Sequence, residues 1–260
     1  MTTILVPYHH DERLADDDIP VQADHTVHAA QAGGDERGAG VGDQWQRNAV
    51  VGRATAAAVA PVVAAGTIPV VFSGDCLVAG ATVAGVQQAG VDPAVIWFDA
   101  HGDVHTLETS SSGYLGGLSL RVITGAHRDR YADLIGLRPV APERAVLVDA
   151  RDLDPAEADY LAFSPTRRIP VPEVSAETIP PGPLVLHVDL DVIDAADLPG
   201  LRFPAVGGPS ADAVLEACRR VFATGRVVAF DVACPWWPAT GDQAKPRAQL
   251  LTILQSLPTT

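Results

Sequence analysis

The chain has 260 residues, of which 47% are hydrophobic, and its formal net charge at pH 7 is -14. This length fits one large α/β domain with a real core, and the composition is that of a globular chain rather than a disordered one. The excess of carboxylates would repel nucleic acid and anionic membrane surfaces, so we expect neither as a partner.

The N-terminal stretch MTTILVPYHHDER lacks the basic start and the long apolar run of a signal peptide. The sequence also has no apolar run long enough to span a membrane. Three cysteines in a chain of this size argue against a disulfide framework. We therefore predict a cytoplasmic protein with reduced thiols.

Short apolar runs alternate along the chain with stretches of helical character. The predicted strands are 4–8, 68–72, 94–100, 144–150, 183–192 and 226–233, and the predicted helices are 46–66, 77–89, 116–125, 210–225 and 243–257. Pro61 is expected to kink or stop the first helix. The segment 9–45 is rich in Asp, Gly and His and is predicted to be a long surface loop near the strand ends.

Most of these strands are almost continuously apolar, which is typical of parallel strands buried between crossover helices. We therefore expect a single doubly wound α/β domain with a mainly parallel sheet and helices on both faces. Ligands bind to such sheets beyond the carboxyl ends of the strands, so the residues placed there are the candidates for function.

Polar residues alternate directly after the apolar strand that ends WFDAHGDVH. Asp99, His101, Asp103 and His105 occur at every second position, and alternate side chains of an extended chain point the same way. Several oxygen or nitrogen atoms can therefore converge on one cation. Taken alone, this pattern is more often a solvated or capping cluster than a metal site.

A second cluster follows the strand that ends HVDLDVID, where Asp189 and Asp191 alternate and Asp194 comes next. Carboxylates that lie side by side in a partly buried site repel each other and need a counter-charge. Two such clusters at one edge of a sheet favour a pair of divalent metals. Oxygen-rich ligation with a few imidazoles suits manganese and, less specifically, iron, cobalt, nickel or zinc.

The stretches DAHGDVHT (99–106), SSSGYLGG (110–117) and HVDLDVIDAADLPG (187–200) resemble the signature motifs of the ureohydrolase superfamily, which includes arginase, agmatinase and formiminoglutamase. The resemblance runs from about residue 68 to 235 and keeps the order of the motifs. It implies one arginase-like α/β domain over residues 1–260 and a homo-oligomer. It also implies a dimanganese site at which a metal-bound hydroxide hydrolyses a C–N bond of a guanidino or amidino compound.

Carried over by position, the resemblance implies a set of six metal ligands. Two would bridge both metals, two would complete one metal, and two would complete the other: Asp99 and Asp189, His101 and Asp191, and Asp103 and Cys76. Asp103 would also have the catalytic role of orienting the hydroxide.

Cys76 follows Gly74-Asp75, where the family has the histidine of a Gly-Asp-His motif, which places the chain in a divergent arginase-like branch. The first metal position would then have a thiolate or lose a ligand. We expect one or two Mn2+ ions per chain, with the position at Cys76 weak or empty.

The resemblance also implies how the substrate is held. Ser112 and His105 stand at positions where the family anchors its substrate, and Gly116 stands where the family has a proton-shuttling histidine. Cys234 falls where a glutamate of the family pairs with the guanidinium group, so Asp231, three residues earlier, is the remaining candidate.

The leading hypothesis is a metal-dependent hydrolase of a small arginine-like compound. The alternative is a degenerate member that binds metal or ligand without hydrolysis, because the shuttle histidine and the glutamate are missing. A cysteine hydrolase with Cys76 as nucleophile has little support, since its base would be His101. His9 and His10 follow the first strand and so lie near the expected edge of the site; they are interpreted as surface histidines, with a role in the pocket as the alternative. Trp236 and Trp237 are interpreted as packing residues or a pocket wall.

Overall fold

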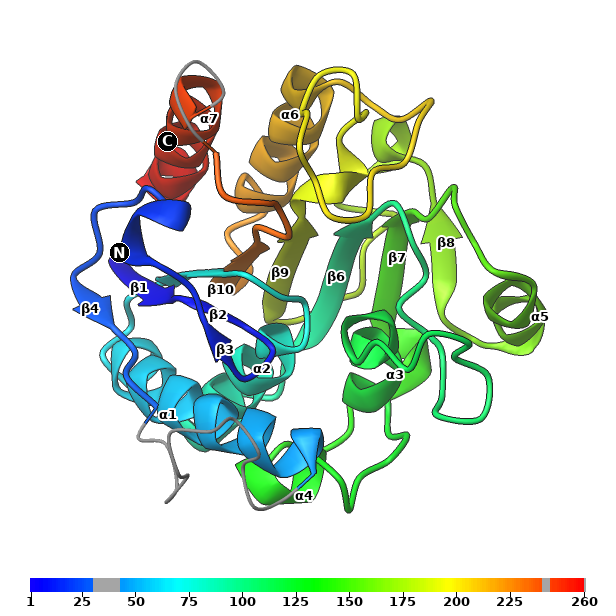
Figure 1. Cartoon of the computed structure of the whole chain (residues 1–260), viewed down its shortest axis with the longest axis horizontal. Coiled ribbons are helices and arrows are strands. Elements are labelled where there is room, and N and C mark those ends of the chain that lie inside the picture. Colours follow the sequence, from blue (N-terminus) through cyan, green and yellow to red (C-terminus); the bar gives the residue numbers. More distant parts are fainter. Residues whose placement is uncertain (30–42, 240–243, 260) are drawn as a thin grey trace.

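The computed structural model describes residues 1–29, 43–239 and 244–259. An eight-stranded sheet forms its centre, and neighbouring strands run parallel throughout. From one edge to the other (Figure 1), the strands are β4 (His25–Thr26), β1 (Thr2–Val6), β5 (Pro69–Ser73), β10 (Val227–Ala233), β9 (Leu184–Asp189), β6 (Ala94–Asp99), β7 (Ala145–Asp149) and β8 (Arg167–Ile169).

Helices cover both faces of this sheet (Figure 1). One face packs against α1 (Gln44–Ala64), α2 (Val78–Gln88), α3 (Ser119–Ile123) and α4 (Ala132–Ile135). The other face packs against α6 (Ala211–Phe222) and α7 (Ala244–Ser256). The helix α5 (Pro155–Phe163) lies beside the β8 edge, and a small hairpin of β2 (Tyr8–His9) and β3 (Glu12–Arg13) follows β1.

The sheet separates two hydrophobic clusters because successive side chains of a strand point to opposite faces. In β6, Val95 and Trp97 belong to the cluster under α1 and α2, whereas Ile96 and Phe98 belong to the cluster under α6 and α7. All six residues of β6 are buried. Burial on both faces explains why the strands read as continuous apolar runs in the sequence.

The predicted fold class is confirmed: a parallel sheet with helices on both faces. Pro61 does not stop α1 but lies in its last turn, where it removes only one internal hydrogen bond. The predicted helix 116–125 is a 3-10 turn followed by the short α3. None of the helices in the described part of the chain is long and apolar enough to cross a membrane.

The elements that the sequence patterns missed include α5 and β8. The helix α5 buries only Glu157, so it shows no apolar stripe, and β8 is an edge strand that exposes Arg167 and Arg168. The described part of segment 9–45 is not one uniform loop, because it contains the hairpin, a 3-10 turn at Asp16–Asp18, β4 and the start of α1. Residues 30–42 of that segment lie outside the described residues.

Candidate metal centre

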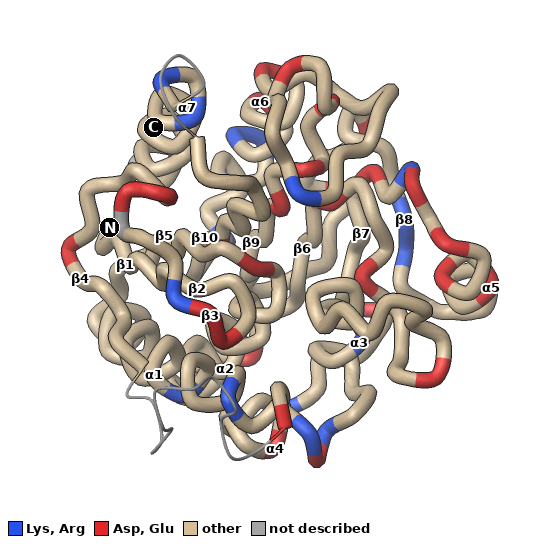
Figure 2. The backbone as a smooth tube through the Cα atoms, in the orientation of Figure 1, with Lys and Arg blue, Asp and Glu red and all other residues tan. Residues whose placement is uncertain are grey.

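The two polar clusters of the sequence meet at the carboxyl ends of the four central strands. The order β5-β10-β9-β6 brings the loop after β5, with Cys76, next to the ends of β9 and β6, which carry Asp189 and Asp99. In Figure 2 an acidic segment lies near the centre of the view, between β10 and β6. All strands of a parallel sheet end at the same edge, so this convergence follows from the topology.

Two overlapping groups of side chains have the geometry of metal ligands. The ligand atoms of Cys76, Asp99 and Asp103 all lie within 4.8 Å of one another, and so do those of Asp99, His101 and Asp191. Asp99 belongs to both groups. Asp189 lies beside the first group, because its Oδ2 is 2.6 Å from the Sγ atom of Cys76. The structure therefore brings together all six side chains that the sequence suggested as ligands.

The carboxylates of this cluster repel one another strongly. Burial, followed by the charges of neighbouring aspartates, raises the pKa of Asp189 and of Asp103 well above the ordinary value. Burial and the charge of Asp99 raise the pKa of Asp191 to about 6. Burial lowers the pKa of His101, but its contacts with Asp191 and Asp99 outweigh this effect and raise that pKa to about 12.

One protonated histidine cannot balance this many buried carboxylates. His101 Nδ1 lies 3.1 Å from Asp191 Oδ2 and 3.4 Å from Asp99 Oδ1. Asp103 Oδ2 is buried and has no hydrogen-bond partner among the described residues. An unpaired buried carboxylate oxygen is costly unless a cation binds it. The donor set therefore fits a divalent metal with oxygen and imidazole ligands.

Two hydrogen bonds orient Asp99, the residue that belongs to both candidate ligand groups. Trp97 Nε1 donates to Asp99 Oδ2 at 3.0 Å, and the backbone N–H of His101 donates to Oδ1 at 2.7 Å. The Trp97 ring stacks on the buried ring of His187 with 3.7 Å between ring centroids. Trp97 and His187 carry no signal in the sequence because both lie within apolar strands, where only pairing across the sheet reveals their partners.

Asp231 lies in this buried layer and not among the candidate ligands. Its Oδ1 pairs with His187 Nδ1 at 2.8 Å, and its Oδ2 accepts a hydrogen bond from Thr82 Oγ1 at 2.6 Å. The side chains of Asp231 and His187 are fully buried. Both oxygens are therefore engaged within the core, and the proposed contact of Asp231 with substrate gains no support from its position.

The surroundings of Cys76 fit a candidate ligand better than a nucleophile. Its thiol donates to Asp189, and burial together with the nearby aspartates raises its pKa well above the ordinary value. A thiol needs a lowered pKa to act as a nucleophile, whereas a bound metal stabilises the thiolate directly. This environment therefore disfavours the cysteine hydrolase hypothesis.

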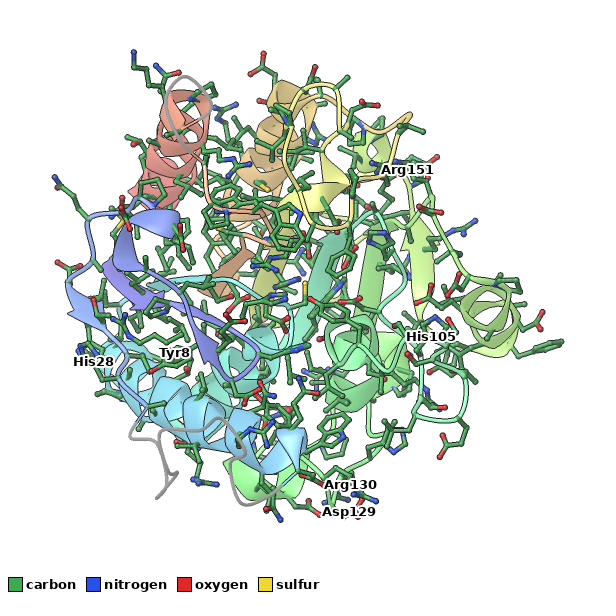
Figure 3. All side chains as sticks on the ribbon, in the orientation of Figure 1. Tyr8, His28, His105, Asp129, Arg130 and Arg151 are labelled. Atoms are coloured by element: carbon green, nitrogen blue, oxygen red, sulfur yellow. The ribbon has the colours of Figure 1, made fainter. Side chains whose placement is uncertain are left out.

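The two residues suggested for anchoring substrate lie outside the cluster. His105 Nε2 lies 3.0 Å from Asp154 Oδ2, and its Nδ1 lies 3.0 Å from Thr109 Oγ1. Figure 3 shows His105 beside α3. Ser112 is exposed and accepts a hydrogen bond from the backbone N–H of Tyr114. Asp154 was missed because it reads as a helix N-cap, which is also its position at α5.

His9 and His10 lie at the edge of the cluster, which agrees with the alternative of a pocket position and not with the favoured surface position. Their side chains are only 12% and 10% exposed, because both lie against Asp75 beside the cluster. The hairpin that carries them folds back over the loop after β5, where the backbone N–H of Gly74 donates to the carbonyl of Tyr8 at 3.0 Å. Sequence patterns gave no signal for this contact between the hairpin and the β5 loop.

Comparison with known proteins identifies the family. The model of the arginase family matches residues 8–236. The chain belongs to the arginase family. The resemblance to the ureohydrolase motifs noted in the sequence is thereby confirmed, and the ligand cluster of this arginase-family chain lies in the matched region.

Individual relatives agree with this assignment. Over 155 residues, the chain is 37% identical to the arginase of Bacillus subtilis, a match that covers 55% of this chain and 52% of that protein. Over 136 residues it is 34% identical to the N(omega)-hydroxy-L-arginine amidinohydrolase of Streptomyces lavendulae, covering 51% and 48%. The matched stretch thus spans about half the length of these curated relatives.

The fold extends further than the sequence identity. The solved structure of the arginase from Bacillus caldovelox superposes with a TM-score of 0.82 at 24% identity, and the match covers 100% of this chain and 99% of that one. The whole described sheet therefore has the arginase fold.

Proposed function

We propose that this chain is a metal-dependent amidinohydrolase that cleaves a C–N bond of a small guanidino or amidino compound. The observation that carries the proposal is the double ligand group, in which Asp99 is shared between Cys76 with Asp103 and His101 with Asp191. A carboxylate shared between two ligand groups is well suited to bind a pair of metals. Membership of the arginase family and the chemistry of the donor atoms support it.

Six side chains would hold the metals: Cys76, Asp99, His101, Asp103, Asp189 and Asp191. When bound, paired divalent ions supply a nucleophilic water near neutral pH and stabilise developing negative charge. We propose that these ions are Mn2+. The position beside Cys76 would bind its ion more weakly, because a protonated thiol is a poor ligand.

The chain's own residues would orient the reaction. Trp97 fixes the direction of Asp99 through its indole N–H. The unpaired Oδ2 of Asp103 can accept a hydrogen bond from water and so orient it towards the planar carbon of the substrate. Burial of these groups strengthens every such contact, because the local dielectric constant is low. His105 and Ser112 are proposed to hold the far end of the substrate.

Arginine-like compounds are the proposed substrate class. The names of two relatives, an arginase and an N(omega)-hydroxy-L-arginine amidinohydrolase, point to arginine and its hydroxylated form. We include the modified arginine because the second relative is named for acting on it. The homo-oligomeric state and the cytoplasmic location remain predictions.

Binding without hydrolysis is the second candidate. The observation that favours it is the position of Asp231, whose two oxygens are engaged by His187 and Thr82 and so leave no carboxylate there for the guanidinium group. A guanidinium without a carboxylate partner binds less strongly.

One assay separates the two candidates. The manganese-loaded chain is incubated with arginine, N-hydroxyarginine and agmatine, and release of urea or hydroxyurea is measured beside the Asp99→Asn variant. Turnover that the variant lacks supports the hydrolase. Binding of these compounds without release of either product supports the second candidate and contradicts the first.

A further inference from the structure

The ring of Tyr114 fills the space that Gly116 leaves empty beside the candidate metal centre. A Cβ atom added at Gly116 would lie 2.3 Å from Cε1, 2.6 Å from Cζ and 2.7 Å from the hydroxyl oxygen of Tyr114. No side chain fits at position 116 while the ring of Tyr114 is in place. The position of the Tyr114 ring therefore requires a glycine at position 116.

The hydroxyl group fixes the ring in this position. It donates to Asp75 Oδ2 at 2.8 Å, and Asp75 Oδ1 in turn accepts the backbone N–H of Leu77 at 2.8 Å. Asp75 is fully buried and directly precedes the candidate ligand Cys76. The ring is thus tied to the same loop that carries a candidate metal ligand.

Three further aromatic rings surround Tyr114, and they come from distant parts of the chain. The centroid of the Tyr114 ring lies 4.7 Å from that of His10, 5.8 Å from that of His9 and 4.6 Å from that of Phe203. Phe203 is 38% exposed, so this aromatic wall continues from the buried carboxylates to the surface.

The acidic group nearest to the ring is Asp75, which accepts the hydrogen bond of the hydroxyl group. Burial, followed by the proximity of Asp75, raises the pKa of Tyr114 well above its ordinary value, so the phenol stays neutral. A neutral aromatic face beside carboxylates attracts a cation through both the ring quadrupole and the carboxylate charges. A planar guanidinium can also stack on such a face.

We propose that Tyr114 is a specificity-determining residue, whose ring binds the planar cationic guanidino or amidino group of the substrate and rejects neutral isosteres. This inference rests on the proposed function, since it names what the same site selects. Gly116 takes part by leaving room for the ring, and Asp75 is the positioning residue that holds the hydroxyl group.

The experiment compares a cation with its neutral isostere. Binding of arginine and of citrulline, which carries a ureido group in place of the guanidino group, is measured on the manganese-loaded full chain. In Tyr114→Leu, we expect the preference for arginine over citrulline to fall by about twofold to thirtyfold, the range of a cation–π contact. Tyr114→Phe keeps the ring and should keep most of the preference.

Two controls make the result decisive. Phe163→Leu removes an aromatic ring that is 92% exposed and should leave the preference unchanged. Gly116→Ala should lower the preference by displacing the ring, yet have no further effect in a Tyr114→Leu background. If Tyr114→Leu does not fold, the single Gly116→Ala variant carries the test.

Other outcomes overturn the proposal. Equal loss of arginine and citrulline binding in Tyr114→Leu would mean that the ring only supports the fold. An unchanged preference in Tyr114→Leu or Gly116→Ala, or equal loss of preference in Tyr114→Phe and Tyr114→Leu, would also contradict it. Because binding is measured and not turnover, a chain that does not hydrolyse arginine can still pass or fail this test.

Discussion

Replacing Asp191 by asparagine should change how the stability of the metal-free chain depends on pH. Burial and the charge of Asp99 raise the pKa of Asp191 from its ordinary value of 3.8 to about 6. The folded chain then binds a proton at this residue more tightly than the unfolded chain does. The resulting stabilisation is complete below about pH 4 and is lost as the pH rises through 6. At about 1.4 kcal/mol for each pKa unit, the loss is about 3 kcal/mol.

The assay is urea unfolding followed by tryptophan fluorescence, in a metal chelator, at pH 4.5 and pH 7. We expect Asp191→Asn to gain stability relative to the wild type by about 2 kcal/mol between the two pH values, since the asparagine cannot ionise and part of the full effect lies below pH 4.5. Asp159→Asn, on the exposed side of α5, is the matched control and should follow the wild type. An Asp191→Asn variant with the pH dependence of the wild type would refute the reasoning.

Three further variants test the metal centre and the layer beneath it. Cys76→His should raise the manganese content measured by metal analysis from about one ion per chain towards two, because a neutral imidazole replaces a protonated thiol; a wild-type content of two ions would show that Cys76 already binds fully, and an unchanged content of one would contradict the prediction. Trp97→Phe removes the hydrogen bond to Asp99 and should weaken manganese binding by about tenfold to a hundredfold in a metal titration, and an unaltered affinity would contradict the positioning role. Asp231→Asn should lower the free energy of unfolding by about 1–3 kcal/mol because it disturbs the pairing with His187; a raised KM with unchanged stability would instead support contact with substrate.

Much of the fold was predictable because burial on both faces of the sheet makes the central strands continuously apolar. The run IPVVF (68–72) predicted β5 within one residue at each end. Elements at the edge of the sheet were not predictable in this way. The strand β8 exposes two arginines, and β4 consists of His25 and Thr26 alone. Such segments become strands only because a neighbouring strand offers its backbone groups.

The sequence by itself determined which residues could bind metal. Alternating Asp and His after an apolar strand is a local pattern, and these side chains point to the same side whatever packs around the strand. It named Asp99, His101 and Asp103, and all three lie in the cluster, whereas Cys76 was implied by the resemblance to the ureohydrolase motifs. Only the tertiary structure decided the partners that come from other strands and loops. Asp231 and His187 pair across neighbouring strands, and Tyr114 fills the space beside the β5 loop. These contacts join residues far apart in the chain. A local sequence pattern carries no information about which distant side chains pack against each other.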